Sequence, residues 1–408
     1  MPVATIILLV AWCGVCSVWI GLIIAQARAR RDGLFLEVAE QTHMDALQPE
    51  AAPSLCVVIA ARNESDGLAA CLRNVLAQDY PAMSVLVVDD RSEDDTLAIA
   101  QQFAQSDSRV RAEHIDTLPR GWMGKSHALW HGTRSARADW LLFMDVDCTL
   151  KPRAISRAVE EARHRNVQVL TLWPRQAAGG FWEHATIPLC GGIIALWFGS
   201  QRINDPGSTL AFANGQFLLF ERQAYEQVRG HEAVRRAIIE DIPLAEHAKR
   251  SGLSCWVASG RDLVSVRMYE NYRGIRDGWA RIFVGSLRSG VKIAASIAWL
   301  IVGSLLPYIA GIVLAVRVCS ARAGGEDIRI DLVLMAALCM IHLAAMMLAS
   351  YRFWGMGGCR RIDLLWYPLS VCVVVRILAR SWWWLMISRS IPWRDTHYAI
   401  DRRGRIVE

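Results

Sequence analysis

The sequence lacks the features of a secreted protein held together by disulfides. No basic segment precedes the first apolar run, which exceeds 20 residues before it ends in several arginines. This pattern favours a retained membrane anchor over a cleaved signal peptide. The eleven cysteines are scattered, and Cys13, Cys339 and Cys372 lie inside apolar stretches. We therefore expect small buried thiols in a reducing compartment rather than a disulfide framework.

Polar residues are scarce for a chain of this size. Hydrophobic residues make up 53% of the 408 residues, which is too apolar for an ordinary soluble domain. The excess lies in four stretches, each about long enough to cross a bilayer core of roughly 30 Å. These are residues 1–25, 293–316, 332–350 and, less cleanly, 364–388. The long segment between the first two has the mixed composition of a globular domain.

Acidic residues are outnumbered by basic ones, and the formal net charge is +6. The basic residues crowd the flanks of the apolar stretches, which favours a cytoplasmic domain. Because these charges follow the hydrophobic stretches, we do not expect nucleic-acid binding. The flanking residues are Arg28, Arg30 and Arg31 on one side, and Arg273, Arg276, Arg281, Arg288 and Lys292 on the other.

The expected organisation follows from these composition changes. It comprises a transmembrane anchor (1–25), a juxtamembrane linker (26–54), an α/β domain (55–292), transmembrane or interfacial helices (293–388) and a basic tail (389–408). Four full crossings would place the basic tail outside, against the positive-inside rule. A last segment that re-enters or lies along the surface would leave the tail on the cytoplasmic side.

Short apolar runs within the domain predict a mostly parallel sheet. Residues 55–61, 84–88 and 140–144 have strand-like composition, and helices are expected over 68–77 and 97–105. This alternation is typical of a doubly wound α/β fold. Polar residues follow each predicted strand directly, at the edge of the sheet where such folds bind ligands.

Paired carboxylates follow two of these strands. Asp145 and Asp147 come after residues 140–144, and at this spacing they can reach one divalent cation such as Mg²⁺ or Mn²⁺. An isolated Asp-x-Asp could equally form a solvated turn. Asp89 and Asp90 adjoin the second strand, and we assign both to ligand binding. The acidic residues at 93–95 are instead explained by a helix N-terminus.

Two further segments carry candidate chemistry. Lys125 follows Gly124 in a P-loop-like turn, but the first glycine of a P-loop is missing and no strand precedes it. The lysine could still contact a phosphate as a point charge. Glu240 and Asp241 lie among isoleucines, where a raised pKa suits a proton acceptor. Asp241 could also cap a helix, because Pro243 follows it closely.

In this order the motifs resemble those of membrane-bound family 2 glycosyltransferases with the GT-A fold. The similarity is strongest to the branch with ceramide glucosyltransferases and hopanoid- and carotenoid-associated enzymes. It implies an α/β fold with a Rossmann-like, mostly parallel sheet, plus transmembrane helices. The matching segments are 57–64, 87–96, 124–128, 143–147 and 213–216, and the pair Glu240–Asp241.

The resemblance implies an inverting, metal-dependent transfer of one sugar from a UDP- or GDP-linked donor to a lipid hydroxyl. The enzyme would sit in a bacterial inner membrane as a multi-pass protein. Asp241 would be the base, beside Glu240, and Asp145 and Asp147 would bind Mg²⁺ or Mn²⁺. The implied nucleotide-sugar contacts are Ala61, Arg62, Asn63, Glu64, Asp89, Asp90, Lys125 and Asp145.

One motif departs from the family pattern. The family ends its catalytic domain with Gln/Arg-x-x-Arg-Trp, whereas two residues separate Arg276 from Trp279 in this chain. This spacing, with few C-terminal spans, favours a single transfer over chain synthesis. Both residues could equally anchor the chain at the membrane interface. The implied acceptor or diphosphate contacts are Asn214, Gly215, Gln216, Arg273, Arg276 and Trp279.

Two other classes of function compete with a transferase. A glycolipid transporter with a non-catalytic α/β domain would use Arg376, in the last apolar stretch, as a pathway residue. A catalytically inactive scaffold is the third interpretation. Three or four spans make a thin transporter, and the retained acidic residues speak against a scaffold.

Overall fold

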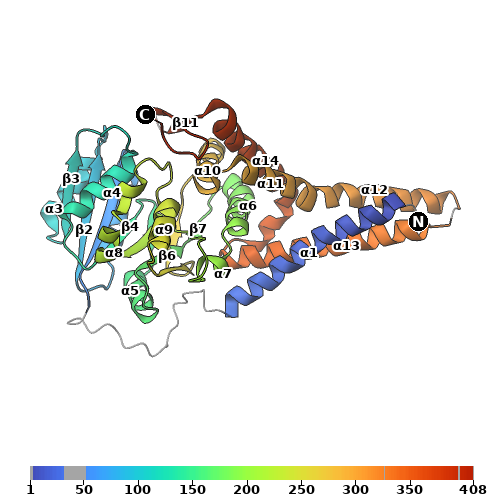
Figure 1. The fold of residues 1–408 in the computed structure, drawn as a ribbon, viewed down its shortest axis with the longest axis horizontal. Coiled ribbons are helices and arrows are strands. Elements are labelled where there is room, and N and C mark those ends of the chain that lie inside the picture. Colours follow the sequence, from blue (N-terminus) through green and yellow to red (C-terminus); the bar gives the residue numbers. More distant parts are fainter. Residues whose placement is uncertain (1–2, 32–51, 326, 394–395, 408) are drawn as a thin grey trace.

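The computed structural model describes residues 3–31, 52–325, 327–393 and 396–407. An α/β domain lies at one end, and long helices extend from it at the other (Figure 1). Most of the linker expected over residues 26–54 lies outside the described ranges.

The centre of the α/β domain is a seven-stranded sheet with the order β3-β2-β1-β4-β8-β6-β9. The first four strands of this order are parallel, β8 runs antiparallel to both neighbours, and β6 and β9 are parallel. The mostly parallel sheet expected from the sequence is therefore confirmed. The strands are β1 (Leu55–Ala61), β2 (Met83–Asp90), β3 (Val110–Ile115), β4 (Trp140–Met144), β6 (Val169–Trp173), β8 (Phe217–Glu221) and β9 (Cys255–Ser259).

Side chains of the central strands alternate between two hydrophobic cores because successive residues of a strand point to opposite faces. In β1, Leu55, Val57 and Ile59 enter one core, and Cys56 and Val58 enter the other. The first core also contains residues of α2 (Ser65–Leu76), α3 (Thr96–Ser106) and α5 (Ala154–His164). The second contains residues of α4 (Gly124–Ser135), α8 (Arg222–Gln227) and α9 (Asp241–Arg250). Helices therefore cover both faces of the sheet.

A second, three-stranded sheet has the order β5-β10-β7, and its strands are β5 (Cys148–Leu150), β7 (Arg175–Gln176) and β10 (Val264–Val266). Short helical segments complete the domain: α7 (Ser200–Ile203) and the 3-10 turn η2 (Gly230–Val234).

A layer of helices lies between the α/β domain and the extension. It consists of α6 (Phe181–Trp197), α10 (Tyr272–Leu287), α11 (Gly290–Trp299) and α14 (Tyr367–Trp383), and the turns η4 (Arg361–Trp366) and η5 (Trp384–Ser388) flank α14. Figure 1 shows α6, α10 and α14 side by side in this layer. The buried carboxylate of Glu183 fixes the start of α6 by an ion pair with Arg267 of 2.9 Å.

The extension consists of α1 (Val3–Arg31), α12 (Leu306–Ala323) and α13 (Ile330–Met356). The π-helical turn η3 (Leu300–Leu305) joins α11 to α12, and its Gly303 carbonyl accepts a 2.9 Å bond from Trp19 Nε1. Within the described residues, four helices are long and apolar enough to cross a membrane. They are Val3–Ala29, Gly290–Ala323, Ile330–Met356 and Arg361–Ser388.

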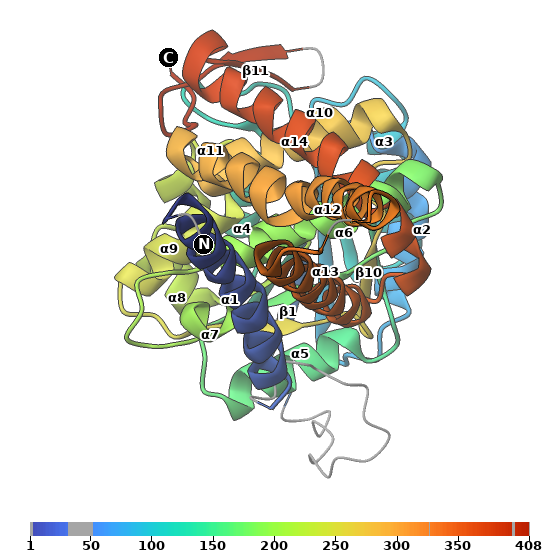
Figure 2. The same ribbon diagram turned by 90° about the vertical axis from the view of Figure 1, so that its right-hand side faces the viewer.

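The C-terminal tail returns to the α/β domain. Strands β11 (Ser390–Trp393) and β12 (Thr396–Ala399) form an antiparallel hairpin that lies beside α14 and α10 (Figures 1 and 2). Beyond the hairpin, the backbone N–H of Ile406 donates to the carbonyl of Arg236 at 3.0 Å. The tail and the α/β domain are thus in direct contact.

Candidate active site

A cavity of about 560 Å³ opens at the carboxyl ends of β1, β2 and β4. Its wall also includes the start of α4, the loop before β8, the start of α9, and parts of α6, α10 and the C-terminal hairpin. The charged residues that line it are Arg62, Glu64, Asp90, Lys125, Asp145, Asp147, Glu240, Asp241 and Arg281. Most of the ionisable groups singled out in the sequence therefore meet in one place.

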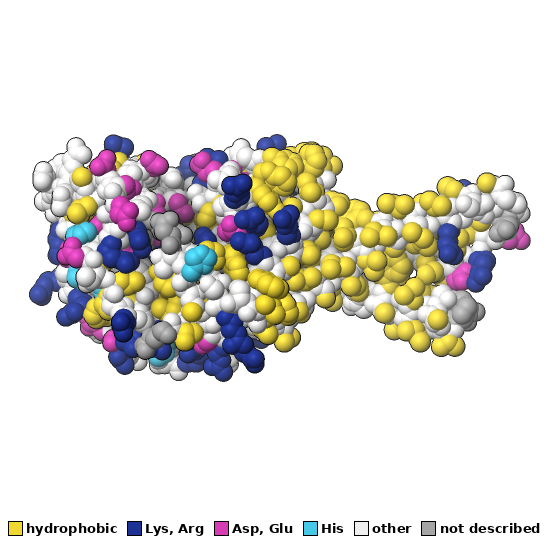
Figure 3. Space-filling model, turned by 90° about the horizontal axis from the view of Figure 1, so that it is seen from above, with side chains coloured by type: hydrophobic (Ala, Val, Ile, Leu, Met, Phe, Trp, Pro, Cys, Tyr) yellow, Lys and Arg dark blue, Asp and Glu magenta, His cyan; other side chains and the backbone are white. Residues whose placement is uncertain are grey.

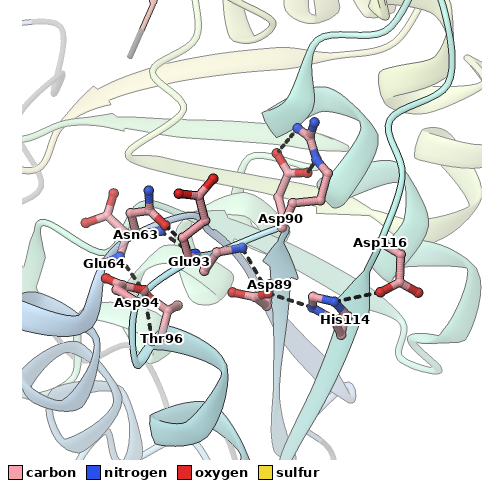
Figure 4. A network of polar contacts seen from close by, with 11 residues as sticks. Asn63, Glu64, Asp89, Asp90, Glu93, Asp94, Thr96, His114 and Asp116 are labelled. Atoms are coloured by element: carbon pink, nitrogen blue, oxygen red, sulfur yellow. Dashed lines mark hydrogen bonds and ion pairs between the residues drawn. The ribbon is translucent and has the colours of Figure 1, made fainter. Parts of the chain in front are cut away.

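The turns that follow β1 and β2 are tied to each other by polar contacts (Figure 4). Asn63 has a left-handed backbone with φ of 50°, a conformation that asparagine tolerates better than most residues. Its backbone N–H donates to Ser92 Oγ, and its Oδ1 accepts from the N–H of Glu93, both at 2.9 Å. The N–H of Glu64 donates to Thr96 Oγ1 at 2.8 Å. These bonds hold the rim of the cavity in one conformation.

Asp89 and Asp90 have different surroundings although they are adjacent in β2. Asp89 is fully buried and does not line the cavity; its Oδ2 lies 2.7 Å from Nδ1 of His114 on β3. Asp90 lines the cavity and forms an ion pair of 2.8 Å with Arg91. A Cβ added at Gly124 would collide with the Asp90 carboxylate, so glycine permits their close approach. Asp90 is thus the member of the pair placed to contact a ligand.

Lys125 bridges two carboxylates from distant parts of the chain. Its Nζ lies 2.7 Å from Asp145 Oδ1, after β4, and 2.9 Å from Glu240 Oε1, before α9. Burial raises the pKa of Glu240, but the nearby ammonium of Lys125 outweighs this effect and the net pKa is lowered. The three side chains form a compact charged cluster, with Glu240 held in its ionised form.

Asp241 begins α9 and faces the same cavity. Its Oδ2 accepts from the Gly215 N–H at 2.8 Å, and its Oδ1 accepts from the Ile242 N–H at 2.6 Å. Burial and the neighbouring charge of Glu240 raise the pKa of Asp241 to about 7. A carboxylate with this pKa can accept a proton near neutrality. Asp241 is the first residue of α9, whereas Glu240 occupies the N-cap position that the sequence suggested for Asp241. The role of Asp241 as base stays a prediction.

Asp145 and Asp147 fit a divalent cation by the chemistry of their donor atoms. Burial, then the charge of Asp145, raises the pKa of Asp147 to about 7, and the positive charge of Lys125 offsets this only in part. A hard cation with oxygen preference would supply further positive charge. No group of three or more His, Cys, Asp or Glu side chains able to hold a metal occurs among the described residues. A cation would therefore need ligand oxygens, such as phosphates, besides this pair.

The cavity takes in most of the sequence-predicted contacts but leaves some outside. Asn63, Asp89, Arg273 and Arg276 do not line it. The sequence-predicted residues that do are Ala61, Arg62, Glu64, Asp90, Lys125, Asp145, Asp147, Asn214, Gly215, Gln216, Glu240, Asp241 and Trp279.

The altered arginine motif lies within α10, and its residues face different surroundings. Arg276 turns away from the cavity and pairs with Asp277 at 2.8 Å, and Asp277 also pairs with Arg380 of α14 at 2.8 Å. Trp279 lines the cavity and is buried. The cation that α10 contributes to the cavity is Arg281, which the sequence indicated only as a charge beside a membrane stretch.

One side of the cavity is apolar. Trp173 stacks on Phe212 with a centroid distance of 5.0 Å, and Ile194 of α6 and Ile282 of α10 complete this wall. The same two helices pack toward the long apolar helices. An apolar wall next to a cluster of carboxylates suits an acceptor with a polar end and a hydrophobic body.

Comparisons with known proteins agree with this geometry. Residues 56–229 match the family Glycosyl transferase family 2, and this part of the chain is a family 2 glycosyltransferase domain. Within the described residues, the α/β domain has the GT-A fold, and the chain also contains long apolar helices. A solved mannosyltransferase, PcManGT from Pyrobaculum calidifontis in complex with GDP-Man and Mn²⁺, matches 92% of this chain and 99% of its own. Its TM-score is 0.50 at 15% sequence identity.

Curated relatives are similar over most of their length. The 4,4'-diaponeurosporenoate glycosyltransferase of Staphylococcus aureus strain MRSA252 is 23% identical over 353 residues, which cover 86% of this chain and 89% of the relative. The corresponding protein of strain USA300 is 24% identical over 355 residues, with the same coverage. These matches confirm the predicted resemblance to membrane-bound family 2 glycosyltransferases and to their carotenoid-associated branch. The protein is a glycosyltransferase.

Proposed function

We propose that this protein transfers a single sugar from a nucleotide-sugar donor, linked to UDP or GDP, to a lipid hydroxyl at a membrane surface, with inversion at the anomeric carbon. The observation that carries the proposal is the position of Asp241. Two backbone N–H groups orient its half-buried carboxylate toward a cavity that also contains the Asp145–Asp147 pair and Arg281.

Each charged group has a role in this reaction. Asp145 and Asp147 would hold Mg²⁺ or Mn²⁺, which stabilises negative charge on the leaving nucleoside diphosphate when it is bound. Asp90 and the turns at Arg62 and Glu64 would bind the nucleoside side of the donor. Arg281 would make a charge-assisted bond to phosphate oxygens. Asp241 would take the proton of the acceptor hydroxyl as its oxygen attacks the sugar from the face opposite the leaving group.

Lys125 would act both on the donor and on the carboxylates. In the structure its ammonium pairs with Asp145 and Glu240. From this position it could reach donor phosphates as a point charge while still keeping Glu240 ionised. An ionised Glu240 beside Asp241 is one cause of the raised pKa of Asp241.

The acceptor is proposed to be a lipid because the apolar wall of the cavity belongs to the helical layer that joins the long apolar helices. Hydrophobic side chains cover the extension, and lysine and arginine side chains gather on the α/β part of the molecule (Figure 3). The staphylococcal relatives are named for 4,4'-diaponeurosporenoate, which favours a long, largely hydrocarbon acceptor for this chain as well.

The tail contact supports a specific membrane arrangement. If α11–α12 and α13 cross the membrane, the chain returns to the side of the α/β domain before η4. Because the tail contacts that domain, α14 would lie along the membrane surface rather than cross it. The domain and the tail would then share the cytoplasmic side of a bacterial inner membrane, in accord with the positive-inside rule.

Sugar transfer into the lipid phase tests the proposal. The purified protein in detergent would be given a bacterial lipid extract, Mg²⁺ or Mn²⁺, and radiolabelled donors from a panel of UDP- and GDP-sugars. Asp241→Asn serves as the inactive partner. Asp262→Asn is the matched control, because Asp262 is a half-exposed carboxylate outside the cavity.

We expect one donor to give metal-dependent label in the organic phase with the wild type and the Asp262 variant, but not with the Asp241 variant. Nucleotide release without label in any lipid would contradict the lipid acceptor. If no donor turns over while the protein moves a glycolipid between vesicle leaflets, the transporter interpretation replaces the transferase.

A further inference from the structure

The C-terminal hairpin presents aromatic side chains to the cavity. Its register pairs Ile391 with Tyr398 and Trp393 with Thr396, so Ile391, Trp393 and Tyr398 share one face. Ile391 is buried in the core, and Trp393 and Tyr398 line the cavity. His397 points to the opposite face and is exposed. One face of the hairpin therefore contributes side chains to the cavity wall.

Trp393 positions the cavity's arginine. The Arg281 guanidinium carbon lies 5.2 Å from the centre of the Trp393 ring, within range of a cation–π contact. Arg281 Nη1 also donates to the carbonyl of Pro392 at 3.4 Å. Both contacts come from β11, so the hairpin helps to set the direction of this cation, together with a hydrogen bond between Arg281 and Tyr269.

Tyr398 lines the same cavity as Asp90, the residue proposed to bind the nucleoside. The bond to Asp90 raises the pKa of Arg91, and the charge of Tyr398 adds a smaller effect in the same direction. Asp90, Tyr398, Trp393 and Arg281 all line the cavity. The apolar wall formed by Trp173, Phe212 and Ile194 comes from other elements. The hairpin thus shares one cavity with both Asp90 and Arg281.

The tail beyond the hairpin is fastened next to the catalytic pair. Arg405 forms an isolated bridge with Ala237, three residues before Glu240. Gly404 has φ of 68°, and a Cβ there would lie 3.1 Å from Val284 Cγ1 of α10, so glycine allows this close packing. Ile400 and Ile406 are buried in the same core as Val284. These contacts hold the hairpin in place.

We propose that Trp393 and Tyr398 of the C-terminal hairpin are donor-binding residues, which contact the nucleoside diphosphate of the sugar donor through their rings and through Arg281. This rests on the proposed function, since it assigns the donor side of that site. Aromatic rings bind nucleobases by stacking with little dependence on the base. The tail is then part of the active site rather than an appendage.

Kinetics of point variants in the full-length protein test the assignment. Trp393→Ala and Tyr398→Ala would be compared with Tyr398→Phe, which keeps the ring, and with His397→Ala on the outer face of the same strand. Loss of one base–aromatic stack corresponds to roughly tenfold or more in affinity. We expect the donor KM to rise by that factor in both alanine variants while the acceptor KM and the melting temperature change little. Tyr398→Phe and His397→Ala should resemble the wild type.

Photolabelling gives a readout that does not depend on variant folding. Wild-type protein would be irradiated with azido-substituted UDP or GDP and Mn²⁺, digested with trypsin and mapped by mass spectrometry. We expect label in the peptides that span residues 390–402, reduced by an excess of unmodified nucleotide.

The outcomes separate this assignment from the proposed function. Label that maps only to the turns after β1 and β2, with an unchanged donor KM in both alanine variants, overturns the hairpin assignment and leaves the transferase intact. A rise in acceptor KM alone would move both rings to the acceptor side and also overturn it. If the wild type neither turns over nor is labelled by any nucleotide, the proposed function itself fails.

Discussion

Two adjacent carboxylates, Glu240 and Asp241, have different hydrogen-bond partners and opposite pKa shifts. Glu240 pairs with the Lys125 ammonium at 2.9 Å, and its pKa is lowered. Asp241 accepts hydrogen bonds from two backbone N–H groups, and its pKa is raised to about 7 by burial and by Glu240. Neighbouring titratable groups with pKa values pushed apart are typical of an acid–base site.

Asp241→Asn should abolish most transfer while the donor still binds. The amide keeps the size and can still accept from Gly215, but it cannot take a proton. General-base catalysis is typically worth about 10²–10⁴-fold in rate, and we expect a loss in that range. Transfer rate and nucleotide affinity would be measured on the same preparation. A variant that transfers at more than a tenth of the wild-type rate would refute the role of Asp241 as base.

The pH profile should report the raised pKa of Asp241. Below its pKa the base is protonated and inactive, so kcat should rise with pH through about 7 and then level off. Measurements at saturating donor and Mn²⁺ keep Asp147 ionised, so that its own titration does not contribute. A kcat that is constant from pH 5.5 to pH 8 would contradict the assignment.

His114→Ala should destabilise the α/β domain, although His114 does not line the cavity. Asp89 is fully buried, and the variant removes its 2.7 Å partner. Breaking a buried pair is costly, but His114 is partly exposed, so we expect about 1–2 kcal/mol of lost stability after allowance for solvent screening. The pKa of His114 is raised, chiefly by its bond to Asp89. The stabilisation is therefore fully present below the unfolded pKa of about 6.5 and declines as pH rises through the folded value.

Melting curves of the wild type and the His114 variant, recorded from below to above the pKa of His114, provide the measurement. The difference in melting temperature between the two proteins should become smaller as the pH rises. A difference that widens with pH would reverse the sign of the coupling and contradict the Asp89–His114 interpretation.

At the scale of elements, helix α10 explains why the arginine motif could not be interpreted from sequence alone. Arg276 and Arg281 are five residues apart, which places them roughly 140° apart around the helix. Arg276 faces Asp277 and α14, whereas Arg281 faces the cavity and Trp393. One helix thus uses one arginine for packing and another for the site.

Exchanging each arginine for glutamine should separate these roles. Arg281→Gln removes a charged contact to phosphate, and we expect kcat/KM for the donor to fall about tenfold or more, in line with the strength of a charge-assisted bond. Arg276→Gln should lower the melting temperature and leave the donor kinetics nearly unchanged. The opposite pattern would assign the diphosphate contact to Arg276, one of the roles that the resemblance implied for it.

The sequence predicted the central strands well because buried parallel strands are continuous apolar runs; β1 spans the predicted residues 55–61. It did not predict β3, the edge strand, because Arg111 and Glu113 interrupt its apolar pattern. Asp90, Asp145 and Asp147 were predicted from their positions after strands, and Glu240 and Asp241 from their apolar neighbours. Arg281, Trp393 and Tyr398 were missed because their place depends on helix phase and on contact between segments far apart in the chain.

At the scale of the whole molecule, the return of the tail links the membrane arrangement to the active site. The loop between α12 and α13 lies at the far end of the extension, and the hairpin lies beside the α/β domain (Figure 1). In the proposed arrangement one crossing, α11–α12, precedes this loop and one crossing, α13, follows it. The loop should therefore be on the opposite side of the membrane from both the domain and the tail.

Epitope accessibility in spheroplasts tests this arrangement. A tag inserted after Gly325 should be cleaved by external protease, while a tag after the last residue should be protected until the membrane is opened. Retained activity of both tagged proteins serves as the control for folding. External cleavage of the C-terminal tag in an active protein would show that α14 crosses the membrane, contrary to the proposed topology.

The anomeric configuration of the lipid product tests the central claim most directly. The glycolipid made by the wild type from its preferred donor would be isolated, and its anomeric coupling constant and number of sugars determined by NMR and mass spectrometry. We expect one sugar per lipid, with a configuration opposite to that of the donor. Retained configuration would contradict direct displacement assisted by Asp241, and a chain of sugars would contradict single transfer.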